Sequence, residues 1–252
     1  SLVITMPEAE ITMGDNHVTY YAVWAADTNE NDIPDYLEEK YSVSYEAGLD
    51  SVEGTTPNDE NEYLEGITYI VKENTLTNNN SVFIGWSTTN PEKIIATQEE
   101  QDNITIVTEN SEEVMGNADV VYFAVWAEDK NNNQTPDYQE EHYTIEFVAG
   151  ENGTIEGTAK YENILVDLTF EEAGIVVPTP VANENYIFKG WNPVVVETVT
   201  GNVTYVAEFA PDFNHNQIDD TTEEHYTVEF TTDHKELLEG TDNKERFKMI
   251  RN

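Results

Sequence analysis

The feature of this sequence that most limits its fold is an internal repeat. Three ten-residue segments align without gaps: VTYYAVWAAD begins at Val18, VVYFAVWAED at Val120 and VTYVAEFAPD at Val203. Each is followed by a polar loop and then by a second matched segment. The second segments are EEKYSVSYEAG from Glu38, EEHYTIEFVAG from Glu140 and EEHYTVEFTTD from Glu223.

Two shorter motifs recur in the same order. FIGW at Phe83 is matched by FKGW at Phe188, and EGT follows Val52, Ile155 and Leu238. A fixed order of motifs indicates a duplicated structural unit, because each repeat in such a chain is one packed unit. The blocks are unequally spaced, so one copy carries an insertion.

The repeat predicts how the chain is divided. Complete modules are expected at 41–127, with an insertion at about 87–118, and at 143–210. Residues 1–26 are expected to be the C-terminal part of a preceding module and 226–252 the N-terminal part of a following one. Linkers are expected at 27–40, 128–142 and 211–225.

Period-two alternation predicts β-strands within the modules. Tyr143, Ile145 and Phe147 fall on one face, and the residues between them fall on the other. No amphipathic helix longer than about two turns is expected from the apolar spacing. The fold class is therefore mainly β, in small tandem modules. Trp24, Trp86, Trp126 and Trp191 recur at matched positions and are expected to be core residues rather than sugar-stacking surfaces.

The order of these motifs resembles the Listeria–Bacteroides repeat, also called the internalin B-repeat family. The matching residues are Tyr143–Phe147, Glu156–Thr158, Phe188–Trp191 and Tyr205–Phe209. The resemblance covers both complete and both partial modules. It implies small β-grasp-like domains in tandem on a surface protein. Phe209 departs from the pattern, since Trp24 and Trp126 occupy that position in the other copies.

The loops between the matched blocks have the ligand spacing of a calcium-binding EF-hand loop. They are DTNENDIPDYLE from Asp27, DKNNNQTPDYQE from Asp129 and DFNHNQIDDTTE from Asp212. Oxygen-bearing side chains fall at positions 1, 3, 5, 9 and 12, and position 7 would supply a backbone carbonyl. The predicted ligands are Asp27, Asn29, Asn31, Ile33, Asp35 and Glu38; Asp129, Asn131, Asn133, Thr135, Asp137 and Glu140; and Asp212, Asn214, Asn216, Ile218, Asp220 and Glu223.

Two departures predict weak calcium sites. Position 6, normally Gly, is Asp32, Gln134 or Gln217, and positions 3 and 5 are Asn rather than Asp. The first loop also resembles a thrombospondin type 3 repeat. A bound calcium ion would be structural: it would neutralise carboxylates that otherwise repel one another and would stiffen the linker. The alternative is a plain polar linker, because Asp, Asn and Pro are common turn formers.

The excess of acidic over basic residues limits the classes of partner that the chain can bind. The chain has 51 acidic and 11 basic residues, so we expect it to repel nucleic acid and anionic membranes and to attract cations. Its 14 Tyr, 9 Phe and 4 Trp are sufficient for a core, which argues against disorder. No apolar run of transmembrane length is present in this segment, so we expect no membrane insertion within it.

These observations predict an extracellular or cell-surface structural repeat protein, such as a stalk, adhesin spacer or surface-filament component. No catalytic motif is present, and we expect no enzyme activity. The alternative is a glycan- or protein-binding region of a secreted or cell-surface enzyme. A host or cell-surface ligand is an expected partner. The complementary partial modules at the two ends also predict head-to-tail self-association by strand addition, against the alternative that the chain is a piece of a longer array.

Overall fold

The chain folds into units built almost entirely from β-strands. The computed structural model describes residues 10, 12, 14–17, 19–228 and 247–250. It divides into two compact units, Ser1–Glu128 and Asp129–Asn252, which we call unit 1 and unit 2. The prediction of a mainly β fold in tandem modules is confirmed.

Unit 1 is organised around a four-stranded sheet in the order β3-β1-β8-β6. Its strands are β1 (Tyr41–Glu46), β3 (Glu62–Tyr63), β6 (Ser81–Ser87) and β8 (Val120–Glu128). The first and last strands, β1 and β8, lie side by side in the centre and are parallel, with Val43 opposite Val120. The two edge strands pair antiparallel with them. In this β-grasp-like arrangement the first and the last strand of the module are neighbours in the centre of the sheet.

Smaller elements complete unit 1. Two antiparallel pairs are formed by β2 (Glu53–Gly54) with β5 (Leu76–Thr77) and by β4 (Thr68–Ile70) with β7 (Glu112–Val114). The first loop contains a single 3-10 turn, η1 (Asp35–Leu37), and the helix α1 spans Gln98–Asp102.

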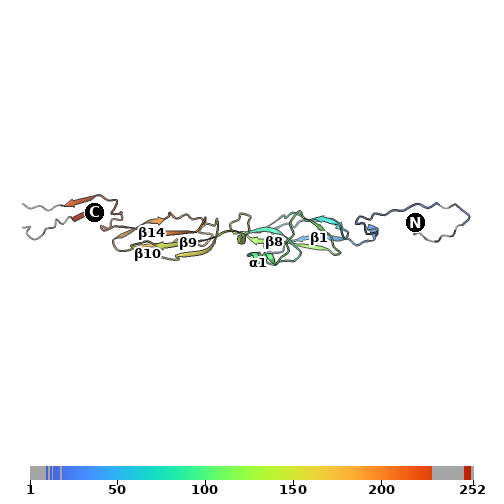
Figure 1. Ribbon diagram of the computed structural model, residues 1–252, viewed down its shortest axis with the longest axis horizontal. Helices are drawn as coiled ribbons and strands as arrows, with labels where there is room; N and C mark the ends of the chain where they lie inside the picture. Colours follow the sequence, from blue (N-terminus) through green and yellow to red (C-terminus); the bar gives the residue numbers. More distant parts are fainter. Residues whose placement is uncertain (1–9, 11, 13, 18, 229–246, 251–252) are drawn as a thin grey trace, which may run out of the picture. The chain divides into compact units, whose positions relative to one another are not determined.

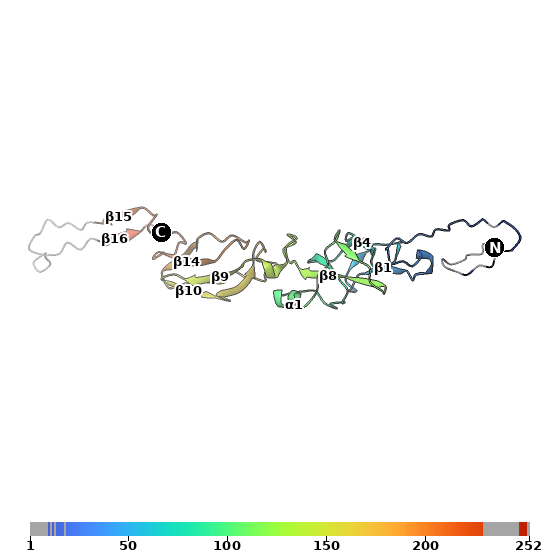
Figure 2. The ribbon, with the colours of Figure 1, turned by 45° about the vertical axis from the view of Figure 1, so that its right-hand side comes forward.

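Unit 2 repeats the same sheet in the order β11-β9-β14-β13. Its strands are β9 (His142–Ala149), β11 (Lys160–Leu165), β13 (Tyr186–Asn192) and β14 (Val203–Pro211). Here too the first and last strands are parallel neighbours, with Ile145 opposite Val203. The remaining elements are η2 (Asp137–Gln139), the pair β10 (Gly153–Glu156) and β12 (Thr179–Ala182), and the pair β15 (His225–Val228) and β16 (Phe247–Ile250), seen in Figure 2.

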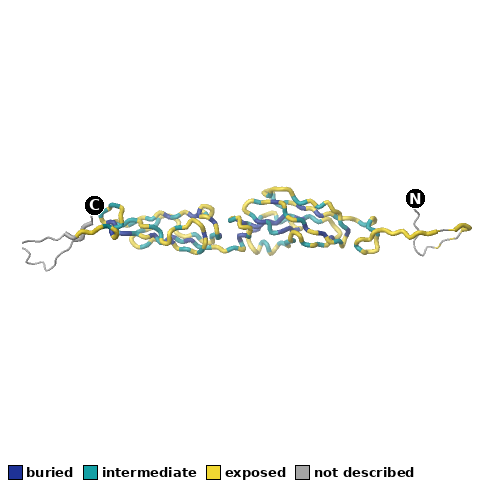
Figure 3. The backbone as a smooth tube through the Cα atoms, turned by 90° about the horizontal axis from the view of Figure 1, so that it is seen from above, coloured by how far each residue is buried: buried dark blue, intermediate teal, exposed yellow. Residues whose placement is uncertain are grey.

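Each unit has its own aromatic core, and Figure 3 shows buried residues along the strands of both. In unit 1, Tyr45 packs edge-on against Trp86 and stacks on Tyr122. In unit 2, Phe147 packs edge-on against Trp191 and stacks on Tyr205. The matched positions in the repeat therefore build matched cores.

The four Trp residues differ in burial. Trp86 and Trp126 are buried and Trp191 is partly buried, as expected for core positions. Trp24 is 90% exposed, so the expectation of a core position is wrong for it. The reason is local: residues 19–26 are extended and have no partner strand among the described residues, whereas the matching segment of unit 1 is the central strand β8.

The predicted insertion in unit 1 is the segment between β6 and β7. It contains α1, whose N-terminus is capped by Thr97, and an extended stretch that joins the sheet through a bridge between Trp86 and Val107. Thr97 caps because its side chain accepts the backbone N–H of Glu100. The insertion is therefore part of the sheet rather than a free loop.

Parts of the predicted terminal modules lie outside the described residues. These are 1–9, 11, 13, 18, 229–246 and 251–252, so the predicted strand exchange between chains stays a prediction. Across the part of the chain that is described, no helix has the length and apolar character needed to cross a membrane.

Candidate functional site

The three acidic loops share one backbone frame, fixed by the Asp at position 1. In the second loop, Asp129 accepts the N–H groups of Asn133 and Gln134, each at 3.0 Å. The same pair of bonds joins the residues at loop positions 5 and 6 to Asp27 in the first loop and to Asp212 in the third. A carboxylate that accepts two N–H groups in this way draws the chain into a tight turn.

Left-handed residues at positions 4 and 6 complete that turn. In the second loop, Asn132 has φ 55° and Gln134 has φ 69°. The corresponding φ values are 56° and 66° in the first loop and 56° and 65° in the third, at Glu30, Asp32, His215 and Gln217. Position 6 thus takes the conformation for which EF-hand loops use Gly, although none of the three loops has Gly there.

Side-chain amides at positions 3 and 5 hold the Glu at position 12. The Asn133 amide donates to Glu140 at 2.6 Å, and the Asn131 amide donates to the same carboxylate at 3.1 Å. Glu38 and Glu223 are held by the matching Asn pairs. The Glu at position 12 is therefore held against positions 3 and 5 by hydrogen bonds, and its role as a calcium ligand stays a prediction.

The Asn at position 3 also fastens the loop to the module that follows it. Asn29 donates to the carbonyl of Glu65 at 3.0 Å, and Asn131 donates to the carbonyl of Val166 at 3.1 Å. Both acceptors lie in matched turns of their modules. One side chain thus ties the loop to a turn of its own unit.

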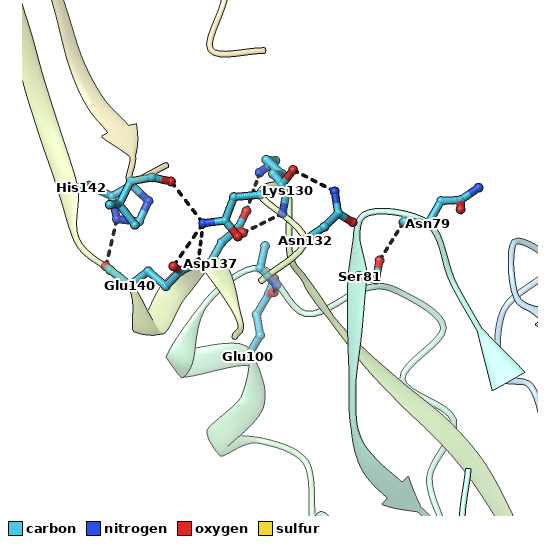
Figure 4. A network of polar contacts seen from close by, with 11 residues as sticks. Asn79, Ser81, Glu100, Lys130, Asn132, Asp137, Glu140 and His142 are labelled. Atoms are coloured by element: carbon cyan, nitrogen blue, oxygen red, sulfur yellow. Dashed lines mark hydrogen bonds and ion pairs between the residues drawn. The ribbon is translucent and has the colours of Figure 1, made fainter. Parts of the chain in front are cut away.

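The Asp at position 9 closes the other side of the loop. In each loop this Asp accepts the backbone N–H of the residue at loop position 2, at 2.7 to 2.9 Å; the three acceptors are Asp35, Asp137 and Asp220. Hydrogen bonds from the side chain and backbone of Thr28 lower the pKa of Asp35. Figure 4 shows the second loop, where Asp137 lies beside Lys130 and His142 lies beside the carbonyl of Glu140.

Burial of the acidic groups differs among the loops. Asp129 and Asp212 at position 1, and Asp137 and Asp220 at position 9, are buried, whereas Asp27 is exposed. A buried carboxylate requires compensating hydrogen bonds or a cation. The second and third loops therefore have the stronger electrostatic need for positive charge.

Three buried loop oxygens accept no hydrogen bond. They are Oδ1 of Asn29 at position 3, Oε2 of Glu38 at position 12 and Oδ1 of Asp220 at position 9. All three fall on predicted ligand positions, and all are hard oxygens of the kind that calcium binds. The donor atoms are thus of the type that calcium prefers, and calcium binding stays a prediction. Asp129, Asp137 and Glu140 do not form a cluster of three acidic ligands by themselves, nor do their counterparts in the other loops, within the described residues.

The sequence predicted the loop residues but not the donor role of the Asn amides. An Asn side chain presents an oxygen on one side and an NH₂ group on the other, and a half-turn exchanges them. The Asn pair can therefore hold Glu140 through its N–H groups or offer oxygens to a cation. The presence of Asn rather than Asp at positions 3 and 5 was the sequence feature that could have predicted this donor role.

Comparison with known proteins gives little beyond this geometry. No family model matches the chain, and no curated protein matches it. A solved structure of Streptococcal High Identity Repeats in Tandem (SHIRT) domains 3-4, from a cell surface protein, aligns at 14% identity with a TM-score of 0.28. The alignment covers 68% of this chain and 98% of that one. The membership of the Listeria–Bacteroides repeat family implied by the sequence motifs stays a prediction.

Proposed function

We propose that this chain is part of an extracellular structural repeat protein whose inter-module loops bind calcium. The supporting observation is the shared frame of the three loops, together with buried oxygens that accept no hydrogen bond, at positions 3 and 12 of the first loop and position 9 of the third. Asn29, Asp220 and Glu38 are the residues that show it.

Calcium would act on the linker rather than on a substrate. The residues that would hold it are those at positions 1, 3, 5, 9 and 12, with the carbonyl of position 7. A bound divalent cation would offset the charge of the carboxylates at positions 1, 9 and 12. Because Asn131 also bonds Val166 in the next module, an ordered loop fixes the segment from which that module starts. The proposed role is thus mechanical, in a stalk, adhesin spacer or surface filament.

The burial of Trp86 and Trp126 favours the structural role over a glycan-binding one. Trp86 and Trp126 are buried, so their faces are not free to stack on a sugar, and the partly buried Trp191 packs edge-on against Phe147 and Phe188. A binding role would need exposed aromatic faces at the repeat positions, and of the four Trp residues only Trp24 is classed as exposed.

Calcium is expected to raise the unfolding temperature through the loops. With dissociation constants of about 10⁻⁴ to 10⁻³ M, as in extracellular modules, about 10 mM calcium should stabilise each occupied site by roughly 1.5–3 kcal/mol. Thermal melts with calcium, and with calcium plus chelator, measure this directly.

A matched pair of triple variants separates the loops from general charge screening. At a net charge of −40, any divalent cation can stabilise the chain somewhat. E38Q/E140Q/E223Q should lose most of the calcium effect, whereas E39Q/E141Q/E224Q removes the same charge one residue away and should keep it. Equal calcium shifts in the two triple variants would refute loop binding.

A further inference from the structure

Unit 1 covers the outer edge of its strand β6 with a segment of its own insertion. The backbone N–H and carbonyl of Trp86 form two hydrogen bonds with Val107, at 2.8 and 2.7 Å, in an antiparallel bridge. The segment 104–108 reads Ile-Thr-Ile-Val-Thr, with its three apolar side chains half-buried and its two Thr exposed. It therefore acts as a short fifth strand.

The packing of that segment depends on a glycine. A methyl group built on Gly85 would lie 2.4 Å from Cγ2 of Ile106 and 3.0 Å from the carbonyl oxygen of Val107. The first distance is too short for real atoms, and the second is tighter than most real contacts. The bare backbone of Gly85 is thus the surface against which Ile106 rests.

Unit 2 has the same edge without the covering segment. Strand β13 pairs with β14 in the register that β6 uses with β8, including the irregularity just before the glycine. In unit 1 the N–H and carbonyl of Trp86 point away from β8, toward Val107. By the same register, the N–H and carbonyl of Trp191 point away from β14, toward the outer edge of the sheet. Within the described residues no backbone group pairs with Trp191 on that side, and a methyl group built on Gly190 would meet no atom within 4 Å.

The surroundings of this edge are apolar and open. Phe188 is 38% exposed, and the short connection after β13 leaves Val194 and Val196 exposed. Edge strands are often protected by a lysine, and Lys189 lies on β13, but its ammonium group lies 3.6 Å from Asp219 of the third loop. Unpaired backbone groups beside exposed apolar side chains form a template for another strand.

We propose that the outer edge of β13, from Phe188 to Asn192, is a docking site for an extended peptide segment of a partner protein. The segment would bind antiparallel to β13, as 104–108 binds to β6, and form two hydrogen bonds with the Trp191 backbone. This proposal is independent of calcium binding by the loops.

Unit 1 indicates the chemistry of the partner. The residue over Gly190 should be β-branched and apolar, as Ile106 is over Gly85, and its successor must carry a free N–H, as Val107 does. Proline at that successor position would remove the donor. The strongly acidic chain would disfavour acidic flanks, so neutral or basic flanks are expected.

The test uses the full chain and a synthetic peptide copied from its own sequence. A capped peptide of residues 103–108, Asn-Ile-Thr-Ile-Val-Thr, is titrated into isotope-labelled protein while the backbone amides are followed by NMR. We expect shifts at Gly190, Trp191 and Asn192 and slower hydrogen exchange of the Trp191 amide. Trp86 should not respond, because its edge is already occupied.

Two controls make the outcome decisive. The peptide with Val107→Pro should bind about tenfold more weakly, because it lacks the donor to the strand edge. In the protein, Ile106→Asp should loosen the intrinsic segment and make Trp86 respond to the peptide. The proposal is overturned if millimolar peptide leaves Trp191 unchanged or if the Pro peptide binds equally well. It is also overturned if ultracentrifugation shows a dimer and the Trp191 amide is already protected from exchange without peptide, because β13 would then be occupied by a second copy of the chain.

Discussion

At the scale of single residues, the loops hold non-glycine residues in a conformation that glycine adopts most easily. Gln134 and Gln217 have left-handed φ values at position 6, held by hydrogen bonds from their own N–H groups to the Asp at position 1. A left-handed residue with a Cβ costs roughly 1–2 kcal/mol. The bonds to that Asp offset the cost.

Replacing Gln134 by Gly should therefore stabilise unit 2. The gain in the free energy of unfolding is expected to be about 0.5–1 kcal/mol, because Gly relieves the strain but loses more conformational freedom on folding. Urea denaturation measures it. Gln139→Gly, in the 3-10 turn of the same loop, is the control and should destabilise. A loss of stability in Gln134→Gly would show that position 6 is unstrained.

The sequence predicted the loop positions because an alternation of oxygen-bearing residues is visible in one dimension. It did not reveal that Asn131 bonds Val166 in the next module, because that contact joins residues far apart in the chain. Nor did it distinguish the exposed Asp27 from the buried Asp129 and Asp212, since all three stand at position 1 of the same Asp-x-Asn-x-Asn pattern.

At the scale of elements, strand formation followed from alternation, whereas strand partners did not. Tyr143, Ile145 and Phe147 share one face as predicted, and the last two are buried. Parallel pairing of β9 with β14 could not be predicted from either strand alone, because alternation specifies a face and not a neighbour. Likewise, the insertion of unit 1 was visible as extra length, but its bridge to Trp86 was not.

Replacing each of the two matched glycines by Ala should separate the stability lost through a packing clash from the stability lost through backbone strain. Gly85 and Gly190 both have positive φ, at 139° and 150°, so Ala strains both backbones. Only Gly85→Ala also clashes with the covering segment, which should cost about 1–3 kcal/mol beyond the loss in Gly190→Ala. Thermal or urea unfolding of each variant checks this. Equal losses would mean that Ile106 does not rest on Gly85.

At the scale of the whole molecule, the core of unit 1 should be sensitive to high pH. Unit 1 contains Tyr45, Tyr63, Tyr69 and Tyr122, and burial raises the pKa of each above its ordinary value. The hydroxyl groups of Tyr69 and Tyr122 also bond one another at 2.9 Å. Ionisation of any of these groups within the fold is disfavoured.

Unit 1 should therefore lose stability above about pH 10, the ordinary pKa of Tyr. The sign follows from the raised pKa values. Below the pKa of the unfolded chain the phenols are neutral in both states, and their contribution to the free energy of unfolding does not change with pH. Above it the phenols of the unfolded chain ionise first, which stabilises the unfolded state and lowers the free energy of unfolding. Tyrosinate absorbance and circular dichroism, recorded together during an alkaline titration, should change in one step for these residues. Ionisation of the four phenols near pH 10 with the β signal intact would contradict the expectation.

The parallel pairing of the first and last strands in each sheet has a consequence for how a unit bears load. Because β1 and β8 run in the same direction, the start of one and the end of the other lie at opposite ends of the pair. A pull applied to the two ends of unit 1 would shear the whole row of hydrogen bonds between these strands at once, rather than unzip them singly. The same holds for β9 and β14. Each unit is thus built to resist tension along the direction in which its chain enters and leaves.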